Sequence, residues 1–202
     1  TSTATAVFGI YFKLQSFIFM PIFAVNNVLV SIISYNYGAK RKDRLLEAYK
    51  YGLVYCVAIM TLGTLVMQLF PEQLFRLFEP SDDMIQLGKQ SLRIISISFP
   101  LAAFSIVSSS CFQALRKGIF SLVNSIARQL VVLLPAAWIL SKIGGVSLVW
   151  WSFPIAEIMS TVLSIVFLKQ IYDQKIRKLD SKETIKETNI NINSKPAYNS
   201  NM

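Results

Sequence analysis

Five long stretches with almost no charged side chains constrain this 202-residue chain more than any other feature. They cover residues 14–39, 51–71, 94–115, 118–141 and 143–168, and the only charged residues inside them are Arg128 and Glu157. Each stretch has about 20 residues or more, the length that crosses a hydrocarbon core of about 30 Å as an α-helix. The sequence therefore predicts an all-α, polytopic membrane helix bundle with five transmembrane helices, at about 4–37, 51–70, 94–115, 118–141 and 144–168.

The overall composition agrees with a chain that faces lipid, and it excludes several soluble classes of protein. Hydrophobic residues make up 53% of the chain and charged residues only 15%, whereas soluble domains carry about 25% charged residues. The net charge of +9 would suit nucleic acid, but the basic residues lie in short breaks between apolar runs, so we expect no nucleic-acid partner. Cys56 and Cys111 fall inside predicted spans, and the chain has no histidine. We therefore expect no disulfide framework, no metal site, no cofactor and no enzymatic activity.

The distribution of Lys and Arg predicts how the spans are oriented. Of these 20 residues, 14 lie in the first and third connections and the C-terminal segment, and 4 lie in the other two connections. Because basic loops stay on the cytoplasmic side, we expect a plasma-membrane protein whose C-terminus is cytoplasmic. Residues 171–202 are polar and predict a disordered cytoplasmic tail. The chain opens without Met, close to an apolar helix, which predicts a fragment of a longer polytopic protein.

Arg128 and Glu157 are charges inside predicted spans, where a charge is costly and marks a candidate functional site. Arg128 lies ten residues after Gly118, and Glu157 lies twelve residues before Lys169. At a rise of about 1.5 Å per residue, these separations place the two charges about 15 and 18 Å from the same membrane edge. Neighbouring antiparallel helices would bring them to one depth, which predicts a structural ion pair. The alternative is a direct part for Glu157 in proton or ion coupling.

The first predicted span carries amide side chains around Pro21. Gln15 lies near its outer part, and Asn26 and Asn27 lie deeper. Amides near a proline bend suit a water-filled pathway, so we predict Gln15, Asn26, Asn27 and Glu157 as candidates for a substrate or ion pathway. The alternative is that the two asparagines only form hydrogen bonds to neighbouring helices.

Three prolines and one lysine are also unusual for membrane spans. Pro100, Pro135 and Pro154 lie at mid-span positions of the last three predicted helices. A proline inside a membrane helix frees a carbonyl and permits a bend, so these helices are predicted to bend. Lys13 is expected to extend its amine to the outer interface.

Four segments of the chain resemble the multidrug and toxic compound extrusion (MATE) transporters. The segment FGIYFKLQSFIFMPIFAVNNVLVSIISYNYGAKRKDR is similar to the eighth span of that family and the loop that follows it. The tenth, eleventh and twelfth spans resemble, in order, RIISISFPLAAFSIVSSSCFQALRKG, RQLVVLLPAAWILSKIGG and VWWSFPIAEIMS. The similarity covers about residues 4–170, and its specificity lies in the combination of the segments.

The resemblance implies a twelve-helix protein of two six-helix lobes that exports organic cations in exchange for H⁺ or Na⁺ by alternating access. This chain would supply about spans 8–12, and its partners would be membrane lipid, organic cations and a missing N-terminal lobe of the same protein. Some branches of the family place a coupling carboxylate in the span that matches residues 94–115, where this chain has no Asp or Glu. The resemblance therefore favours H⁺ over Na⁺ as the coupling ion, with the titrating carboxylate in the N-terminal lobe.

Two other functions stay open at this point. A lipid-linked oligosaccharide flippase of the same superfamily would have several basic residues facing its cleft, and only Lys13 and Arg128 qualify here. A non-transporting membrane scaffold subunit would carry bent helices and polar membrane residues incidentally.

Overall fold

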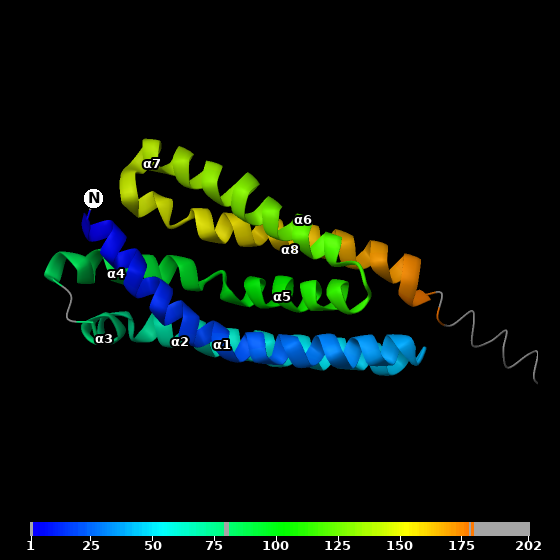
Figure 1. Ribbon diagram of the computed structural model, residues 1–202. Coiled ribbons are helices and arrows are strands. Elements are labelled where there is room, and N and C mark those ends of the chain that lie inside the picture. The colour runs from blue at the N-terminus through cyan, green and yellow to red at the C-terminus, as the bar shows by residue number, and fades with distance from the viewer. Residues whose placement is uncertain (1, 79–80, 178, 180–202) are drawn as a thin grey trace, which may run out of the picture.

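The computed structural model describes residues 2–78, 81–177 and 179, and within them every regular element is helical (Figure 1). The all-α fold class is therefore confirmed. In chain order the elements are α1 (Ser2–Gly38), α2 (Lys42–Leu69), α3 (Pro71–Arg76), α4 (Asp82–Ser96), α5 (Phe99–Ala114), α6 (Gly118–Ile126), the π-helix η1 (Ala127–Leu133), α7 (Leu134–Val149), α8 (Ser152–Ile171) and the π-helix η2 (Tyr172–Ile176).

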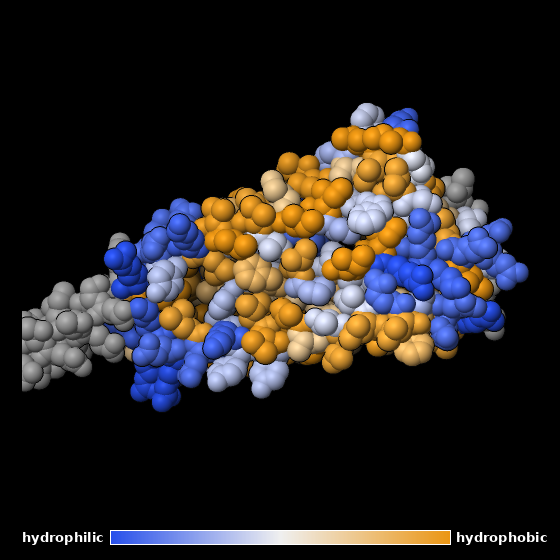
Figure 2. All heavy atoms as spheres, turned by 180° about the vertical axis from the view of Figure 1, so that it is seen from behind, coloured by the Kyte–Doolittle hydropathy of each residue, from blue (hydrophilic) through white to orange (hydrophobic). Residues whose placement is uncertain are grey.

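The long helices run antiparallel to their neighbours along the chain (Figure 1). Four of them are long and apolar enough to cross a membrane, and α4 with α5 makes a fifth if this bent pair is one span. The connections at 39–41 and 115–117 and the segment η2 lie at one end of the bundle, which we call the basic end (Figure 1). The opposite end of the bundle holds α3, the start of α4 and the turn between α7 and α8 (Figure 1). On the face seen in Figure 2, hydrophilic residues gather toward the two ends and hydrophobic residues lie between them.

The third predicted span is bent, as Pro100 led us to expect. The helices α4 and α5 meet at an angle of 48°, where Pro100 has no N–H to donate to the carbonyl of Ser96 one turn earlier. The hydroxyl of Thr64 on α2 donates to that carbonyl at 2.9 Å instead, and Gln68 Nε2 donates to the carbonyl of Arg93 at 2.7 Å. Side chains of α2 thus satisfy the backbone groups that the bend exposes.

The boundary predicted between the last two spans, at residues 141–144, lies beside a break in the helix, but the last span begins later than predicted. Helical structure continues to Val149, although Gly144 and Gly145 interrupt it with non-helical dihedrals, and Gly145 adopts φ +68°. The turn itself is at 150–151, and α8 begins at Ser152. Pro154 consequently lies in the first turn of α8 and not at mid-span. In the first turn a missing N–H costs no helical hydrogen bond. At the other end of α8, residues 172–176 continue as η2, and positions 180–202 of the predicted tail lie outside the described residues.

The apolar core lies between α1, α2, α4 and α5. Phe19 of α1 and Phe99 of α5 make an edge-on contact with ring centroids 5.3 Å apart, and both are buried. Gly52 and Gly63 let α1 approach α2 closely, because a Cβ at either position would collide with Leu29 or Ile18 of α1. The stretch from Gly118 to Val149 packs differently, since Asn124 is its one buried residue. The one side chain that this stretch buries is therefore polar, and it lies on the inner side of the last two spans.

Candidate functional site

Arg128 of η1 and Glu157 of α8 meet inside the bundle. The Arg128 Nη1 atom donates to Glu157 Oε1 at 2.6 Å. The carboxylate side chain is 13% exposed and the guanidinium 34%, so Glu157 is the more deeply enclosed partner. Glu157 Oε2 has no hydrogen-bond partner. The structure therefore brings together the two spans' charges and leaves one carboxylate oxygen free to bind something else.

The π-helical turn that carries Arg128 has a cause in the sequence. Pro135 follows the turn and cannot donate to the carbonyl of Val131, and its ring would also crowd that carbonyl in a regular α-helix. The chain adopts π-helical hydrogen bonding over Ala127–Leu133 just before this proline. Short π segments inside longer helices are frequent at functional sites. Here the segment changes the direction in which Arg128 leaves the helix relative to a regular α-helical turn.

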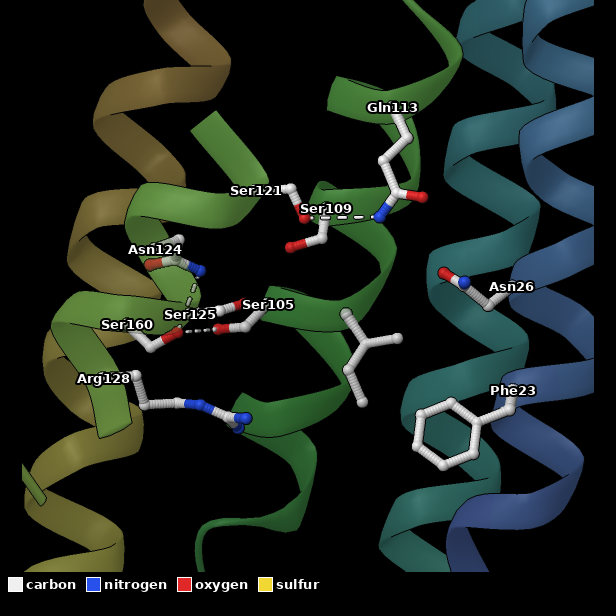
Figure 3. A pocket seen from close by; sticks show the side chains of 11 residues that line it. Phe23, Asn26, Ser105, Ser109, Gln113, Ser121, Asn124, Ser125, Arg128 and Ser160 are labelled. Atoms are coloured by element: carbon white, nitrogen blue, oxygen red, sulfur yellow. Dashed lines mark hydrogen bonds between the residues drawn. The ribbon is translucent and has the colours of Figure 1, made fainter. Parts of the chain in front are cut away.

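A cluster of amide and hydroxyl groups lies one turn from the ion pair. Asn124 Nδ2 donates to Ser160 Oγ at 3.1 Å and to Ser164 Oγ at 3.2 Å. Ser160 Oγ in turn donates to Ser105 Oγ of α5 at 3.2 Å, so the cluster joins α5, α6 and α8 (Figure 3). Asn124 is 3% exposed, yet its Oδ1 atom has no hydrogen-bond partner. Sequence reasoning missed this cluster, although Asn124 lies four residues before Arg128 and Ser160 three after Glu157, which are same-face spacings.

These groups line a cavity of about 200 Å³, which we call the inner cavity. Figure 3 shows Asn124, Ser160 and Arg128 on one side of it and Phe23 and Asn26 of α1 on the other. Its full lining is Phe23, Asn26, Ser105, Ile106, Ser109, Gln113, Ser121, Asn124, Ser125, Arg128 and Ser160. Nine of these 11 residues carry polar side chains, a composition that suits a polar solute or water.

The two predicted asparagines are separated by the structure. Asn26 lines the inner cavity, and its Oδ1 accepts a hydrogen bond from Ser110 of α5. Asn27 is exposed. It lines neither the inner cavity nor the cavity on the other side of Arg128. Consecutive residues of an α-helix point about 100° apart, so a single helix face cannot present both.

A second cavity of about 250 Å³, the outer cavity, lies on the other side of Arg128. Gln15 and Glu157, both predicted as pathway residues, line it together with Gln129. Its remaining lining consists of Phe8, Tyr11, Phe12, Arg128, Leu133, Phe153 and Ala156. The rings of Tyr11 and Phe153 lie edge to face at 6.0 Å. Tyr11 is 1% exposed, and its hydroxyl, like Glu157 Oε2, has no hydrogen-bond partner.

Arg128 lines both cavities, so the ion pair stands between them. A solute that passes from one cavity to the other must pass the guanidinium or displace it. Lys13, in contrast, is exposed, and its Nζ lies 5.7 Å from the ring centroid of Phe78, just after α3. Its charge is therefore directed toward the end of the bundle opposite the basic end. Within the described residues no group of three His, Cys, Asp or Glu side chains could hold a metal ion.

Comparison with known proteins relates the chain to one family of membrane exporters. A model of the family described as MatE matches residues 1–139. The chain is 26% identical over 161 residues to the multidrug export protein MepA of Staphylococcus haemolyticus, a match that covers 80% of the chain and 35% of MepA. It is 23% identical over 157 residues to the FAD transporter of Shewanella oneidensis, with coverage of 78% and 35%.

Solved structures give the same fold. The MATE multidrug transporter DinF-BH is 34% identical, with a TM-score of 0.75 over 84% of this chain and 38% of that one. An outward-facing multidrug resistance MATE family transporter superposes with a TM-score of 0.80 at 22% identity, over 89% and 40% of the two chains. The chain thus spans well under half the length of the relatives it matches.

Proposed function

The chain belongs to the MatE family, and from that premise we propose that it forms part of the second lobe of a secondary active multidrug efflux transporter. The lobe would alternate its access between the two sides of the membrane together with an N-terminal lobe. Its basic end would face the cytoplasm of the plasma membrane, because Lys and Arg of loops stay inside. The proposal agrees with MepA, a multidrug export protein by name, as a relative.

One observation carries the proposal: two polar cavities lie on either side of a single ion pair within an otherwise apolar bundle. Polar groups inside a membrane protein are costly, and they concentrate along substrate and ion pathways. Arg128 and Glu157 join helices η1 and α8, so breaking or exchanging their contact would let these helices shift relative to each other. The bend between α4 and α5 at Pro100 and the π-helical turn before Pro135 are irregular points at which the segments of a span can shift relative to each other.

The chemistry of the outer cavity favours an organic cation as the cargo. Phe8, Phe12 and Phe153 supply aromatic faces, which attract cations. Glu157 Oε2 supplies a negative oxygen without a partner. Arg128 carries the one positive charge that lines this cavity, and Glu157 already neutralises it.

A second candidate cargo comes from the FAD transporter among the relatives. FAD is an anion, so its pathway would need basic groups that are not already paired. Arg128 is paired with Glu157, and Lys13 is directed toward Phe78, away from both cavities. The same two observations weigh against a lipid-linked oligosaccharide flippase. A non-transporting scaffold would need neither cavity.

We infer that H⁺ rather than Na⁺ is the coupling ion. Helix α5 carries no carboxylate, so the position that some family branches use for coupling is empty of acidic groups here. The titrating carboxylate would then lie in the N-terminal lobe, and Glu157 would act chiefly through its ion pair.

The test is ethidium efflux from bacteria that lack their own drug pumps. The cells would express the gene that encodes this chain, with any coding sequence upstream of Thr1 included. We expect efflux that a protonophore abolishes and that persists without Na⁺. Efflux that requires Na⁺ would overturn the coupling ion, and export of FAD without export of ethidium would overturn the cargo.

Glu157→Gln then separates the two roles of that residue. If Glu157 serves the ion pair, the variant accumulates poorly in the membrane, and the fraction that accumulates retains proton-driven efflux. Normal accumulation with complete loss of proton-driven efflux would instead assign the coupling role to Glu157.

A further inference from the structure

A third cavity lies at the basic end, away from the polar cavities. It has a volume of about 340 Å³ and opens between α2 and the joined helices α8 and η2. Cys111 of α5 lines it between these two walls. The remaining lining is Leu45, Leu46, Tyr49, Leu168, Lys169, Tyr172 and Ile176. Apart from Lys169 and the two tyrosine hydroxyls, every side chain of this basal cleft is hydrophobic, so its interior suits a hydrocarbon chain and not a polar solute.

Lysines surround the mouth of the basal cleft. Lys169 lies on its wall, is exposed, and has no acidic partner among residues 2–78, 81–177 and 179. Lys175 of η2 lies 5.8 Å from the ring centroid of Tyr37, at the end of α1. Lys42, at the start of α2, lies 5.9 Å from the ring centroid of Tyr172. The two lysine–tyrosine contacts bridge η2 and the α1–α2 turn, so they keep the ammonium groups beside the opening.

The charge of the surrounding surface has the same sign. Among the described residues, the other basic side chains at this end are Lys40, Arg41, Arg44, Lys50, Arg116, Lys117 and Arg177, and the acidic ones are Asp43, Glu47 and Asp173. An anion at the mouth would therefore meet a net positive field even with these three carboxylates present. Basic pockets between membrane helices on the cytoplasmic side are a known chemistry for binding anionic lipid headgroups.

We propose that the basal cleft is a binding site for an anionic phospholipid. One acyl chain occupies the space between α2 and α8, and the phosphate lies at the mouth beside Lys169 and Lys175. The site needs only that the bundle be in a membrane, and it does not depend on the transport that we propose for the polar cavities. The helices α2 and α8 each pack against α5 and make few direct contacts with each other. A lipid in the basal cleft joins α2 to α8 and so stabilises the basic end.

A second groove on the molecule provides an internal comparison. It has a volume of about 460 Å³ and lies between α1 and α2, with the lining Ala24, Val25, Val28, Leu29, Ile32, Ala48, Tyr51, Gly52 and Tyr55. No lysine or arginine lines this groove. It should accept any lipid chain without regard to the headgroup, whereas the basal cleft should select an anionic one.

Native mass spectrometry of the whole chain in detergent micelles tests the proposal directly. Palmitoyl-oleoyl phosphatidylglycerol (POPG) and the neutral phosphatidylcholine with the same acyl chains (POPC) compete for the unmodified protein. We expect one POPG to be retained in preference to POPC by at least about tenfold, because each lysine near the lipid surface favours an anion by about 1 kcal/mol. Equal retention of the two lipids would overturn the proposal. Inorganic phosphate should not displace POPG, because it lacks the acyl chain.

Variants then locate the site. The double variant Lys169→Gln and Lys175→Gln should weaken the POPG preference by about tenfold or more. The control, Arg93→Gln and Lys142→Gln, removes two exposed charges from the opposite end and should leave the preference unchanged. If both pairs reduce the preference equally, POPG responds to net charge and not to the basal cleft. Leu46→Trp, which keeps every charge and narrows the cleft, should also weaken retention, and full retention in that variant would exclude the cleft as the acyl site.

Discussion

The two halves of the bundle are stabilised in different ways. In α5, ten of the 16 residues are buried, and they pack against α1, α2 and α8. From Gly118 to Val149, a stretch of 32 residues, only Asn124 is buried. The first region interlocks through apolar side chains and glycines. The second contacts the bundle through Asn124, Arg128 and Ser121 and through the half-buried ring of Phe120, which packs against Phe112 and Phe167.

This difference has a physical reason. Lipid chains are as apolar as leucine, so burial of hydrophobic surface does little to drive helices together within a membrane. The α1–α2–α5 region associates through close packing, which needs small residues at the contacts. The α6–η1–α7 region buries none of its apolar side chains fully, so the polar groups that meet on its inner side carry a larger share of its contact. A region attached by a few polar contacts can detach or shift at lower cost, which suits a moving part of a transporter.

Arg128→Ala should have the largest effect of the changes that test this comparison. It leaves the Glu157 carboxylate enclosed without a partner, and removing one member of a buried pair costs about 3–5 kcal/mol. Because Arg128 is 34% exposed, we expect a loss at the lower end of that range. The measurement is the unfolding midpoint in detergent micelles. Lys142→Ala, exposed on α7, is the control, and equal midpoints for the two variants would contradict the assignment.

Gly63→Ala tests the packed region. The added Cβ would collide with Ile18 of α1, and overfilling a packed contact costs about 1–3 kcal/mol. Gly9→Ala is the matched control on α1, since nothing lies within 4 Å of its added Cβ. That variant should be neutral or should stabilise the helix by about 0.5–1 kcal/mol. A loss of stability as large in Gly9→Ala as in Gly63→Ala would show that close approach of α1 and α2 is not the cause.

Asn124→Ala should cost about 1 kcal/mol, the usual range for hydrogen bonds between membrane helices. It removes the donor to Ser160 and Ser164, which joins α6 to α8. Crosslinking or hydrogen exchange should report faster opening of α6 than of α2. Asn27→Ala, an exposed amide on α1, should change neither rate, and a similar change in both variants would argue against the cluster.

The smallest effect concerns the end opposite the basic end. Glu72 lies 2.5 Å from Lys89 Nζ and 2.7 Å from Arg76 Nη2. Its hydrogen bond from Lys89, followed by that from Arg76, holds the pKa of the Glu72 carboxyl below its usual value. A lowered pKa means that the contacts stabilise the fold above the unfolded value, about pH 4.3, and that the stabilisation disappears as pH falls through the lower folded value. The wild type should therefore exceed Glu72→Gln in unfolding midpoint at pH 7, and the difference should shrink below about pH 4 and in high salt. A difference that grows on acidification would contradict this sign.

Much of the architecture could be predicted from the order of charged residues. Long charge-free stretches predicted the helices, and matching depth predicted that Arg128 and Glu157 would be neighbours. The last span begins at Ser152 and not near residue 144 as predicted, because the short segment after the glycine break is largely apolar and hydropathy does not mark where a helix turns. Asn27 was grouped with Asn26, although adjacent positions on one helix face different directions.

Lys13 and Cys111 illustrate how position in space changes the meaning of a residue. Lys13 lies inside a predicted span and was expected to extend its amine to the outer interface, and in the structure it is exposed and contacts Phe78 at the end of the bundle. Cys111 is a small apolar residue by composition, and in the structure it lines the basal cleft. The identity of the ring that Lys13 contacts and the place of Cys111 in the cleft have no signal in the local sequence, because each depends on which distant helix lies alongside.

The order of apolar runs and basic breaks along the chain was sufficient to predict an all-helical membrane bundle, its long apolar helices and the proximity of its two inner charges. Those properties are one-dimensional, since each depends on the distance of a residue from a membrane edge. Only the folded bundle decides which groups share a cavity: Asn124 with Ser160, Tyr11 with Glu157, and Lys169 with Cys111. Such sets depend on helix rotation and on neighbours far away in the chain, which are set by side-chain packing and by the backbone irregularities at Pro100 and Pro135.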